Sequence, residues 1–200
     1  MRALPLLFGW ALAANTWAAA SVGQPAPAFS ALDANGKPVT LADFKGKTVV
    51  LEWVNPECPY VRKHYDSANM QAAQRAATAK EVVWLSVNST HARHADFKTP
   101  AQMRAWTRQQ AAAPNATLMD GDGKIGRAYG ARTTPHLYIV DAKGTLAYAG
   151  GIDDKPSANP ADVKDAKNYI DAALAELQSG KPVTRAVTRA YGCSVKYSDG

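Results

Sequence analysis

The feature that most constrains the fold is a strand–helix–strand pattern between residues 48 and 87. Residues 48–54 (TVVLEWV) and 82–87 (VVWLSV) are rich in β-branched and aromatic side chains, as strands buried on both faces are. Residues 59–80 between them consist mostly of helix formers, and Pro59 suits the first turn of a helix. This order predicts a right-handed parallel crossover and therefore an α/β fold.

The rest of the chain adds elements around this unit. We expect helices over 100–113, 124–129 and 162–178, a short strand over 117–119, and a hairpin of strands 136–140 and 145–149. A turn at 35–38 is predicted to join two short strands near the start. With 200 residues, 46% of them hydrophobic, and no internal repeat, the sequence indicates one globular domain followed by a tail.

The first twenty residues have the pattern of an export signal. Arg2 precedes an apolar stretch from Leu4 to Ala14, and small residues at 18–20 precede Ser21. We predict a cleaved signal over 1–20, a domain over 21–180, a tail over 181–200, and a periplasmic or secreted location. A membrane anchor is the alternative, but the apolar stretch is shorter than the roughly 18–20 residues that span a bilayer.

The formal charge of +6 gives little reason to expect a nucleic-acid partner. Its basic residues are scattered, and no basic stripe is interleaved with aromatic side chains. We interpret the charge as a contribution to solubility.

Cys58 lies where the strand 48–54 gives way to the helix that begins at Pro59. Unpaired backbone N–H groups and the positive end of the helix dipole favour a thiolate over a thiol at such a position. Arg62, Lys63 and His64 in the first turns act in the same direction, and Glu57 opposes them. The alternative is an inert buried cysteine or half of a structural disulfide.

Several motifs in one order resemble the thioredoxin-like superfamily, and within it the exported redoxins related to peroxiredoxins. They are residues 22–29 (VGQPAPAF), 41–47 (LADFKGK), the strand into Cys58-Pro59, 120–124 (DGDGK), 133–135 (TTP) and the closing hairpin. The resemblance implies a central mixed β-sheet flanked by α-helices, with thiol chemistry at Cys58.

The sequence departs from two patterns of these families. Val61 stands where thioredoxins place the second cysteine of Cys-x-x-Cys. Leu51 and Asn55 stand where typical peroxiredoxins place the proline and threonine of Pro-x-x-x-Thr-x-x-Cys. Neither parent activity is therefore expected to carry over unchanged.

Cys193, the other of the two cysteines, lies 193 − 58 = 135 positions after Cys58. If the two meet, the tail supplies a resolving thiol, much as in two-cysteine peroxiredoxins. A permanent disulfide and an intermolecular disulfide are the alternatives.

The resemblance also implies roles for residues around Cys58. Pro135 is expected to follow a cis peptide bond, and the backbone of Thr134 to bind an extended substrate. Glu52 is a candidate proton shuttle with a raised pKa, or else a strand-edge carboxylate paired with a lysine. His64 and His136, with Arg62, are candidates for tuning the thiol.

We therefore expect an exported thiol–disulfide oxidoreductase that acts on protein disulfides or thiols, with no cofactor and with an electron donor that no motif identifies. A peroxiredoxin-like thiol peroxidase with antioxidant activity is the first alternative. The second is a non-enzymatic copper(I) carrier, in which Cys58 and Cys193 bind the metal together with His64 or His136.

Overall fold

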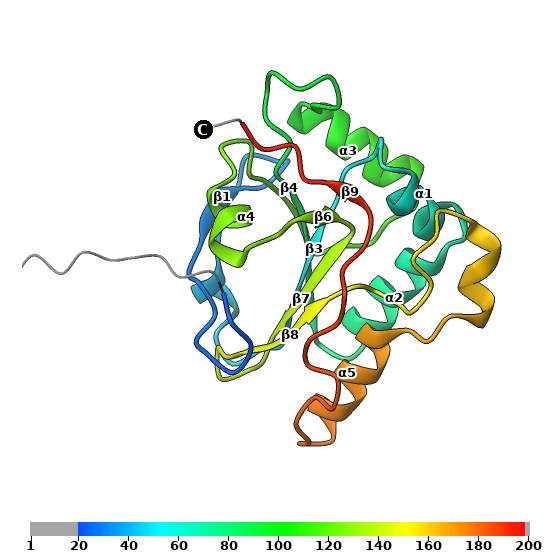
Figure 1. Ribbon diagram of the computed structural model, residues 1–200. Coiled ribbons are helices and arrows are strands. Elements are labelled where there is room, and N and C mark those ends of the chain that lie inside the picture. The colour runs from blue at the N-terminus through cyan, green and yellow to red at the C-terminus, as the bar shows by residue number, and fades with distance from the viewer. Residues whose placement is uncertain (1–19, 199–200) are drawn as a thin grey trace, which may run out of the picture.

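The computed structural model describes residues 20–198, so residues 1–19 of the predicted export signal lie outside the described part. Its centre is a five-stranded sheet in the order β5-β4-β3-β7-β8 (Figure 1). The strands are β3 (Val49–Trp53), β4 (Val83–Asn88), β5 (Ala116–Met119), β7 (His136–Val140) and β8 (Leu146–Gly150). β3, β4 and β5 run parallel, whereas β7 is antiparallel to both β3 and β8. The predicted mixed sheet of an α/β fold is confirmed.

Helices cover both faces of this sheet. On one face lie α1 (Pro59–Asp66), α2 (Asn69–Thr78) and α5 (Tyr169–Gln178), and on the other α4 (Lys124–Tyr129), as Figure 1 shows. Helix α3 (Pro100–Gln109) contributes Met103 to the first face. Strand β3 serves both cores, because Val50 faces the α1 side and Leu51 and Trp53 face the α4 side. Its five residues are all buried, as the run over 48–54 predicts.

The region 59–80, expected to be one helix, is two. α1 ends at Asp66 because the Ser67 hydroxyl donates to the carbonyl of Lys63 at 2.7 Å, and Ala68 then adopts a left-handed conformation with φ 58°. The Gln71 side-chain amide donates to the Tyr65 carbonyl at 2.9 Å. The break lets α2 start in a new direction against the same face of the sheet.

The helix expected over 162–178 is also shorter than predicted. A 3-10 helix, η2 (Pro160–Asp165), comes first, and α5 begins only at Tyr169. Asn168 sets this start, because its side-chain oxygen accepts from the backbone N–H groups of Ile170 and Asp171 at 2.9 and 3.1 Å. An asparagine within an apolar periodic stretch therefore acts as a cap here.

Smaller elements complete the described chain. β1 (Ser30–Leu32) and β2 (Pro38–Thr40) form the expected antiparallel pair around the turn at 35–38, and η1 (Leu41–Phe44) follows. β6 (Thr133–Thr134) pairs antiparallel with β9 (Cys193–Ser194), which the tail provides. Among residues 20–198, no helix is long and apolar enough to cross a membrane.

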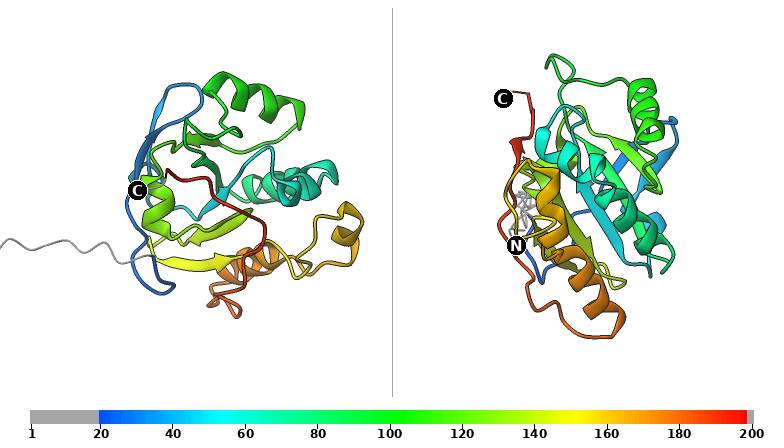
Figure 2. Two further views of the ribbon diagram at one scale, coloured as in Figure 1. Left: turned by 45° about the horizontal axis from the view of Figure 1, so that its top comes forward. Right: turned by 90° about the vertical axis from the view of Figure 1, so that its right-hand side faces the viewer.

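The tail returns along the sheet instead of leaving the domain. After α5 it passes β8, where the Ala149 N–H donates to the Ala186 carbonyl at 3.0 Å and the Thr188 N–H donates to the Ala149 carbonyl at 3.1 Å. It then reaches β6 as β9 (Figure 1 and Figure 2). The second cysteine is thus carried back to the end of the molecule where α1 begins.

Candidate active site

Cys58 is the N-cap residue of α1. Its backbone is extended, and its carbonyl accepts from the N–H groups of Val61 and Arg62, each at 3.0 Å. Pro59 occupies the first helical position, where no N–H is needed. The side chain is only 1% exposed and belongs to the core on the α1 face. The sulfur thus lies at the positive end of a helix dipole and is shielded from solvent.

The Cys58 thiol contacts the segment that precedes β7. Its Sγ donates to the Thr134 carbonyl oxygen at 2.9 Å. The peptide bond between Thr134 and Pro135 is cis, as the resemblance implies. The Thr134 hydroxyl is buried and has no hydrogen-bond partner among the residues described.

Cys193 lies at the same place as Cys58 and Thr134. It stands directly opposite Thr134 in the β6–β9 pair, and both cysteines are free thiols. Burial, together with a hydrogen bond to Cys58, raises the pKa of Cys193 to about 12. Cys193 thus faces the residue whose carbonyl oxygen accepts the hydrogen bond of the Cys58 thiol. The structure therefore brings the two cysteines together, with Cys193 protonated at neutral pH.

Glu52 is fully buried on the α1 side of β3. One carboxylate oxygen accepts from Trp84 at 2.8 Å and from Gln74 and Ser86 at 3.2 Å, and the other accepts from Tyr65 at 2.8 Å. Burial raises the pKa of Glu52, and these hydrogen bonds offset part of that increase. Within residues 20–198 it forms no ion pair with a lysine, and β3 is a central strand, so the strand-edge interpretation is wrong. No described hydrogen bond links it to either cysteine.

The three candidate tuning residues point to other partners. Arg62 is exposed and pairs with Glu57 at 2.7 Å. His64 and His136 are buried, and burial lowers the pKa of each to about 4. Both imidazoles are therefore neutral at neutral pH and supply no positive charge to Cys58.

His64 also has both ring nitrogens occupied, by Asn69 at 2.9 Å and by Tyr191 at 3.1 Å. A copper(I) ion held by this histidine would have to displace one of them. No group of three or more potential metal ligands was found among the described residues.

A buried polar cluster behind α1 has no counterpart in the sequence-based expectations. It consists of Lys63, His64, Asp153 and Tyr191. Nothing in the sequence relates positions 63, 153 and 191, and a lysine within a basic run is typical of an exposed helix face.

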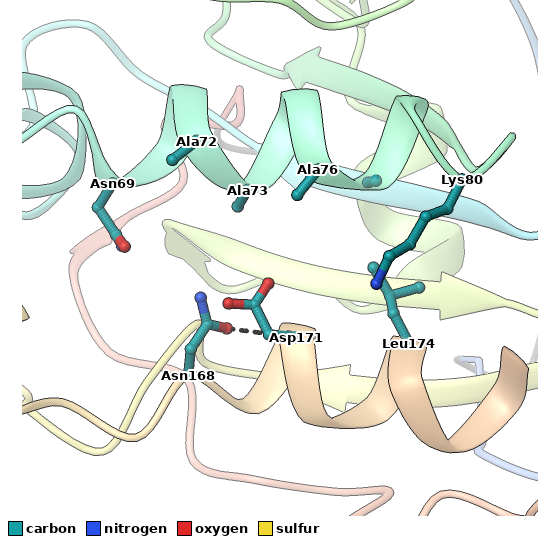
Figure 3. A pocket seen from close by; sticks show the side chains of 9 residues that line it. Asn69, Ala72, Ala73, Ala76, Lys80, Asn168, Asp171 and Leu174 are labelled. Carbon is teal, nitrogen blue, oxygen red and sulfur yellow. Dashed lines mark hydrogen bonds between the residues drawn. The ribbon is translucent and has the colours of Figure 1, made fainter. Parts of the chain in front are cut away.

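A groove of about 230 Å³ lies between α2 and α5, as Figure 3 shows. Alanine side chains of α2 line one wall, and Asp171 and Leu174 line the other. None of its lining residues belongs to the Cys58 turn, β6 or β9, so it is separate from the thiol site.

A mixed sheet of this order, with a cysteine at a helix N-terminus beside a cis-proline, is a thioredoxin-like arrangement. More narrowly, the chain belongs to the AhpC/TSA family, whose model matches residues 22–149.

Among curated proteins, the chain is similar to two named redox enzymes. It is 28% identical over 141 residues to the thiol:disulfide interchange protein DsbE of Yersinia pestis, covering 68% of each chain. It is 26% identical over 132 residues to the thiol-disulfide oxidoreductase ResA of Bacillus cereus, covering 62% of this chain and 66% of the relative.

Solved structures support the same fold. A hypothetical protein from Sinorhizobium meliloti has a TM-score of 0.75 at 24% identity, covering 92% of this chain and 98% of the other. An uncharacterized conserved protein from Geobacillus kaustophilus has a TM-score of 0.76 at 24% identity, covering 90% and 94%.

Proposed function

We propose that this protein is an exported thiol–disulfide oxidoreductase in which Cys58 is the nucleophile and Cys193 the resolving thiol. The observation that carries the proposal is that Thr134 brings together two thiols 135 positions apart at the N-terminus of α1, since it accepts the hydrogen bond of Cys58 and faces Cys193 in the β6–β9 pair. The names of the curated relatives support the reaction class. Export rests on the sequence pattern of residues 1–20.

The proposed reaction transfers two electrons. The Cys58 thiolate attacks one sulfur of a substrate disulfide, which forms a mixed disulfide and releases the first substrate thiol. Cys193 then loses its proton and attacks the Cys58 sulfur, which forms the Cys58–Cys193 disulfide and releases the second thiol. An external dithiol, or two external thiols, must reduce this disulfide before the next turnover.

The raised pKa of Cys193 suits this division of roles. The thiolate is the attacking species, and a thiol that keeps its proton at neutral pH is a poor nucleophile for the first step. Thr134 and Pro135 would hold the strand that carries Cys193 in place, and a substrate that pairs with Thr134 must displace that strand.

In this mechanism Glu52 has a structural role beneath α1, on strand β3. Four donors already hold its carboxylate, and Tyr65, one of them, is a residue of α1 itself. We therefore assign Glu52 to fixing α1 on the sheet, and not to moving a proton at sulfur.

The test compares the wild-type protein with Cys58→Ser and Cys193→Ser in a disulfide-reduction assay with dithiothreitol as the electron donor. We expect Cys58→Ser to lose all turnover. In a single turnover of reduced protein after dithiothreitol has been removed, we expect Cys193→Ser to accumulate the mixed disulfide, detected by mass spectrometry. Unchanged turnover in Cys58→Ser would sink the proposal.

A thiol peroxidase is the second candidate, favoured by the unpartnered Thr134 hydroxyl beside the two thiols. Cys58 would take one oxygen from a hydroperoxide to give a sulfenic acid and an alcohol, and Cys193 would condense with it to release water. Asn55 does not replace the missing threonine, because its side chain already bonds Asp96 and the Glu57 N–H. Stopped-flow oxidation by hydrogen peroxide at a rate no faster than that of free cysteine would exclude this candidate.

A further inference from the structure

A fully buried ion pair lies behind α1, and the proposed mechanism does not use it. The Lys63 ammonium is 3.4 Å from the Asp153 carboxylate and 2.6 Å from the Lys155 carbonyl, and the Lys63 and Asp153 side chains are 0% and 2% exposed. Apolar residues of similar volume usually stabilise a fold as well as a buried ion pair does. The presence of this pair therefore calls for an explanation other than stability.

Tyr191 of the tail is the third member of this cluster. Its hydroxyl donates to the second Asp153 oxygen at 2.5 Å and accepts from Lys63 at 3.2 Å. It also lies 3.1 Å from His64, whose other ring nitrogen faces the Asn69 amide at 2.9 Å. With that amide donating, the imidazole proton lies on the nitrogen facing Tyr191. The phenol oxygen thus uses its one proton and both lone pairs.

The ring of Tyr191 also contacts side chains of α1. The Lys63 ammonium lies 5.2 Å from the ring centroid, a cation–π distance, and the Tyr60 ring packs edge-on at 6.0 Å. Both partners belong to α1, whose first residue follows Cys58 directly. The cluster therefore ties the tail to the helix that carries the proposed nucleophile.

Only Gly192 separates Tyr191 from Cys193, and its backbone conformation is tightly restricted. Its φ of 138° is one that L side chains rarely adopt, and an added Cβ would lie 2.0 Å from the Thr134 carbonyl oxygen. Tyr191 on one side and the β6–β9 pair on the other therefore fix where the Cys193 sulfur lies.

We propose that Tyr191, held by Lys63, Asp153 and His64, is a positioning residue that sets how readily Cys193 closes onto Cys58. This inference rests on the proposed function, in which the two thiols form a disulfide. Oxidised glutathione is a suitable oxidant, because it takes two electrons and two protons from the dithiol and leaves as two molecules of glutathione.

The test measures the equilibrium constant of the Cys58–Cys193 disulfide in glutathione buffers, by alkylation of the remaining thiols and mass spectrometry. Tyr191→Phe keeps the ring and removes the hydroxyl, and we expect it to lower the constant about tenfold. Tyr197→Phe is the matched control, because it removes one tail hydroxyl that donates to a backbone carbonyl, that of Ala131. We expect it to change the constant less than about twofold.

A second variant removes the groups that hold Tyr191 and keeps Tyr191 itself. Lys63→Met with Asp153→Leu replaces the buried pair by apolar side chains but leaves the Tyr191 hydroxyl and the Lys155 backbone groups without these partners. We therefore expect unfolding at a lower urea concentration than in the wild type, with the protein still folded in the glutathione buffers. The same variant should nevertheless form the disulfide about tenfold less readily. It also provides the test if Tyr191→Phe does not fold.

Two results are decisive, and they differ in what they contradict. Wild-type constants in both Tyr191→Phe and the double variant would overturn the positioning role. A wild-type protein that forms no Cys58–Cys193 disulfide in oxidised glutathione would contradict the proposed function itself.

Discussion

Cys193 lies directly opposite Thr134, the residue whose carbonyl accepts the hydrogen bond of Cys58. One two-residue strand pair thus brings the end of the chain to a thiol 135 positions earlier. Because facing side chains of an antiparallel pair lie on the same side, the Thr134 hydroxyl and the Cys193 thiol share one face. In the proposed mechanism, the reaction of the two thiols depends on how well that short pair is maintained.

Gly192→Ala should separate the two thiols. The new methyl group would overlap the Thr134 carbonyl, and alanine is strained at this φ, so we expect β9 to shift and unfolding to need about 2–3 kcal/mol less free energy. Disulfide formation should slow more than tenfold, measured by quenched alkylation. Gly36→Ala is the control, because Gly36 also has a positive φ but an added Cβ there meets nothing within 4 Å. Equal effects of the two substitutions would contradict the prediction.

Glu52→Gln should fold and retain disulfide exchange within about threefold of the wild-type rate. The glutamine oxygen can keep the bonds from Trp84, Gln74 and Ser86, and its amide can donate to the Tyr65 hydroxyl. Glu52→Leu, which leaves these groups without a partner, should lower the free energy of unfolding by about 3 kcal/mol or more. A rate of Glu52→Gln far below that of the wild type, with an intact fold, would support a proton shuttle instead.

The same substitution makes a prediction about pH. Burial raises the pKa of Glu52 above its ordinary value of 4.5, so the folded protein binds this proton more tightly than the unfolded chain does. The wild type therefore loses stability as pH rises from about 4.5 through the folded pKa, and Glu52→Gln escapes that loss. Urea unfolding across this range should show the difference in free energy growing in favour of the variant and then levelling off. A difference that does not vary with pH would contradict the raised pKa.

The resolving step should accelerate with pH. Burial is the largest cause of the raised pKa of Cys193, and it acts whenever β9 pairs with β6 to bring Cys193 to the mixed disulfide. Because only the thiolate attacks, we expect the release of the second thiol to accelerate about tenfold per pH unit from about pH 6 to pH 9. Rapid-quench mass spectrometry of the mixed disulfide measures this rate. A plateau below about pH 8 would show a lower pKa for Cys193 than the structure indicates.

Local composition accounts for most of what the sequence predicts of the fold. The β-branched run 48–54 becomes a central strand because both of its faces are covered, and Pro59 begins α1 where a missing N–H costs nothing. Three helix predictions were too long, since the helix expected over 100–113 ends at Gln109, and the other two fail for an equally local reason. Ser67 and Asn168 bond to neighbouring backbone groups and end or begin a helix within an otherwise continuous pattern.

The candidate site shows what a single sequence leaves undetermined. Cys58 can be located from its place between a strand and a helix. The contact between Cys58 and Cys193 joins residues 135 positions apart, and no periodic pattern in the sequence encodes it. The cluster of Lys63, Asp153 and Tyr191 reverses the usual expectation that a lysine is exposed, because the loop that carries Asp153 and the tail that carries Tyr191 cover it.

The hydrogen bonds between the tail and Ala149 have a further consequence for association between molecules. β8 is the last strand of the sheet, and residues 186–188 cover the backbone of its Ala149. The segment that delivers Cys193 therefore also shields a free sheet edge, onto which another chain could add a strand. A tail that detached to admit a bulky substrate would bare this edge, so access to the thiols and self-association of the protein are linked.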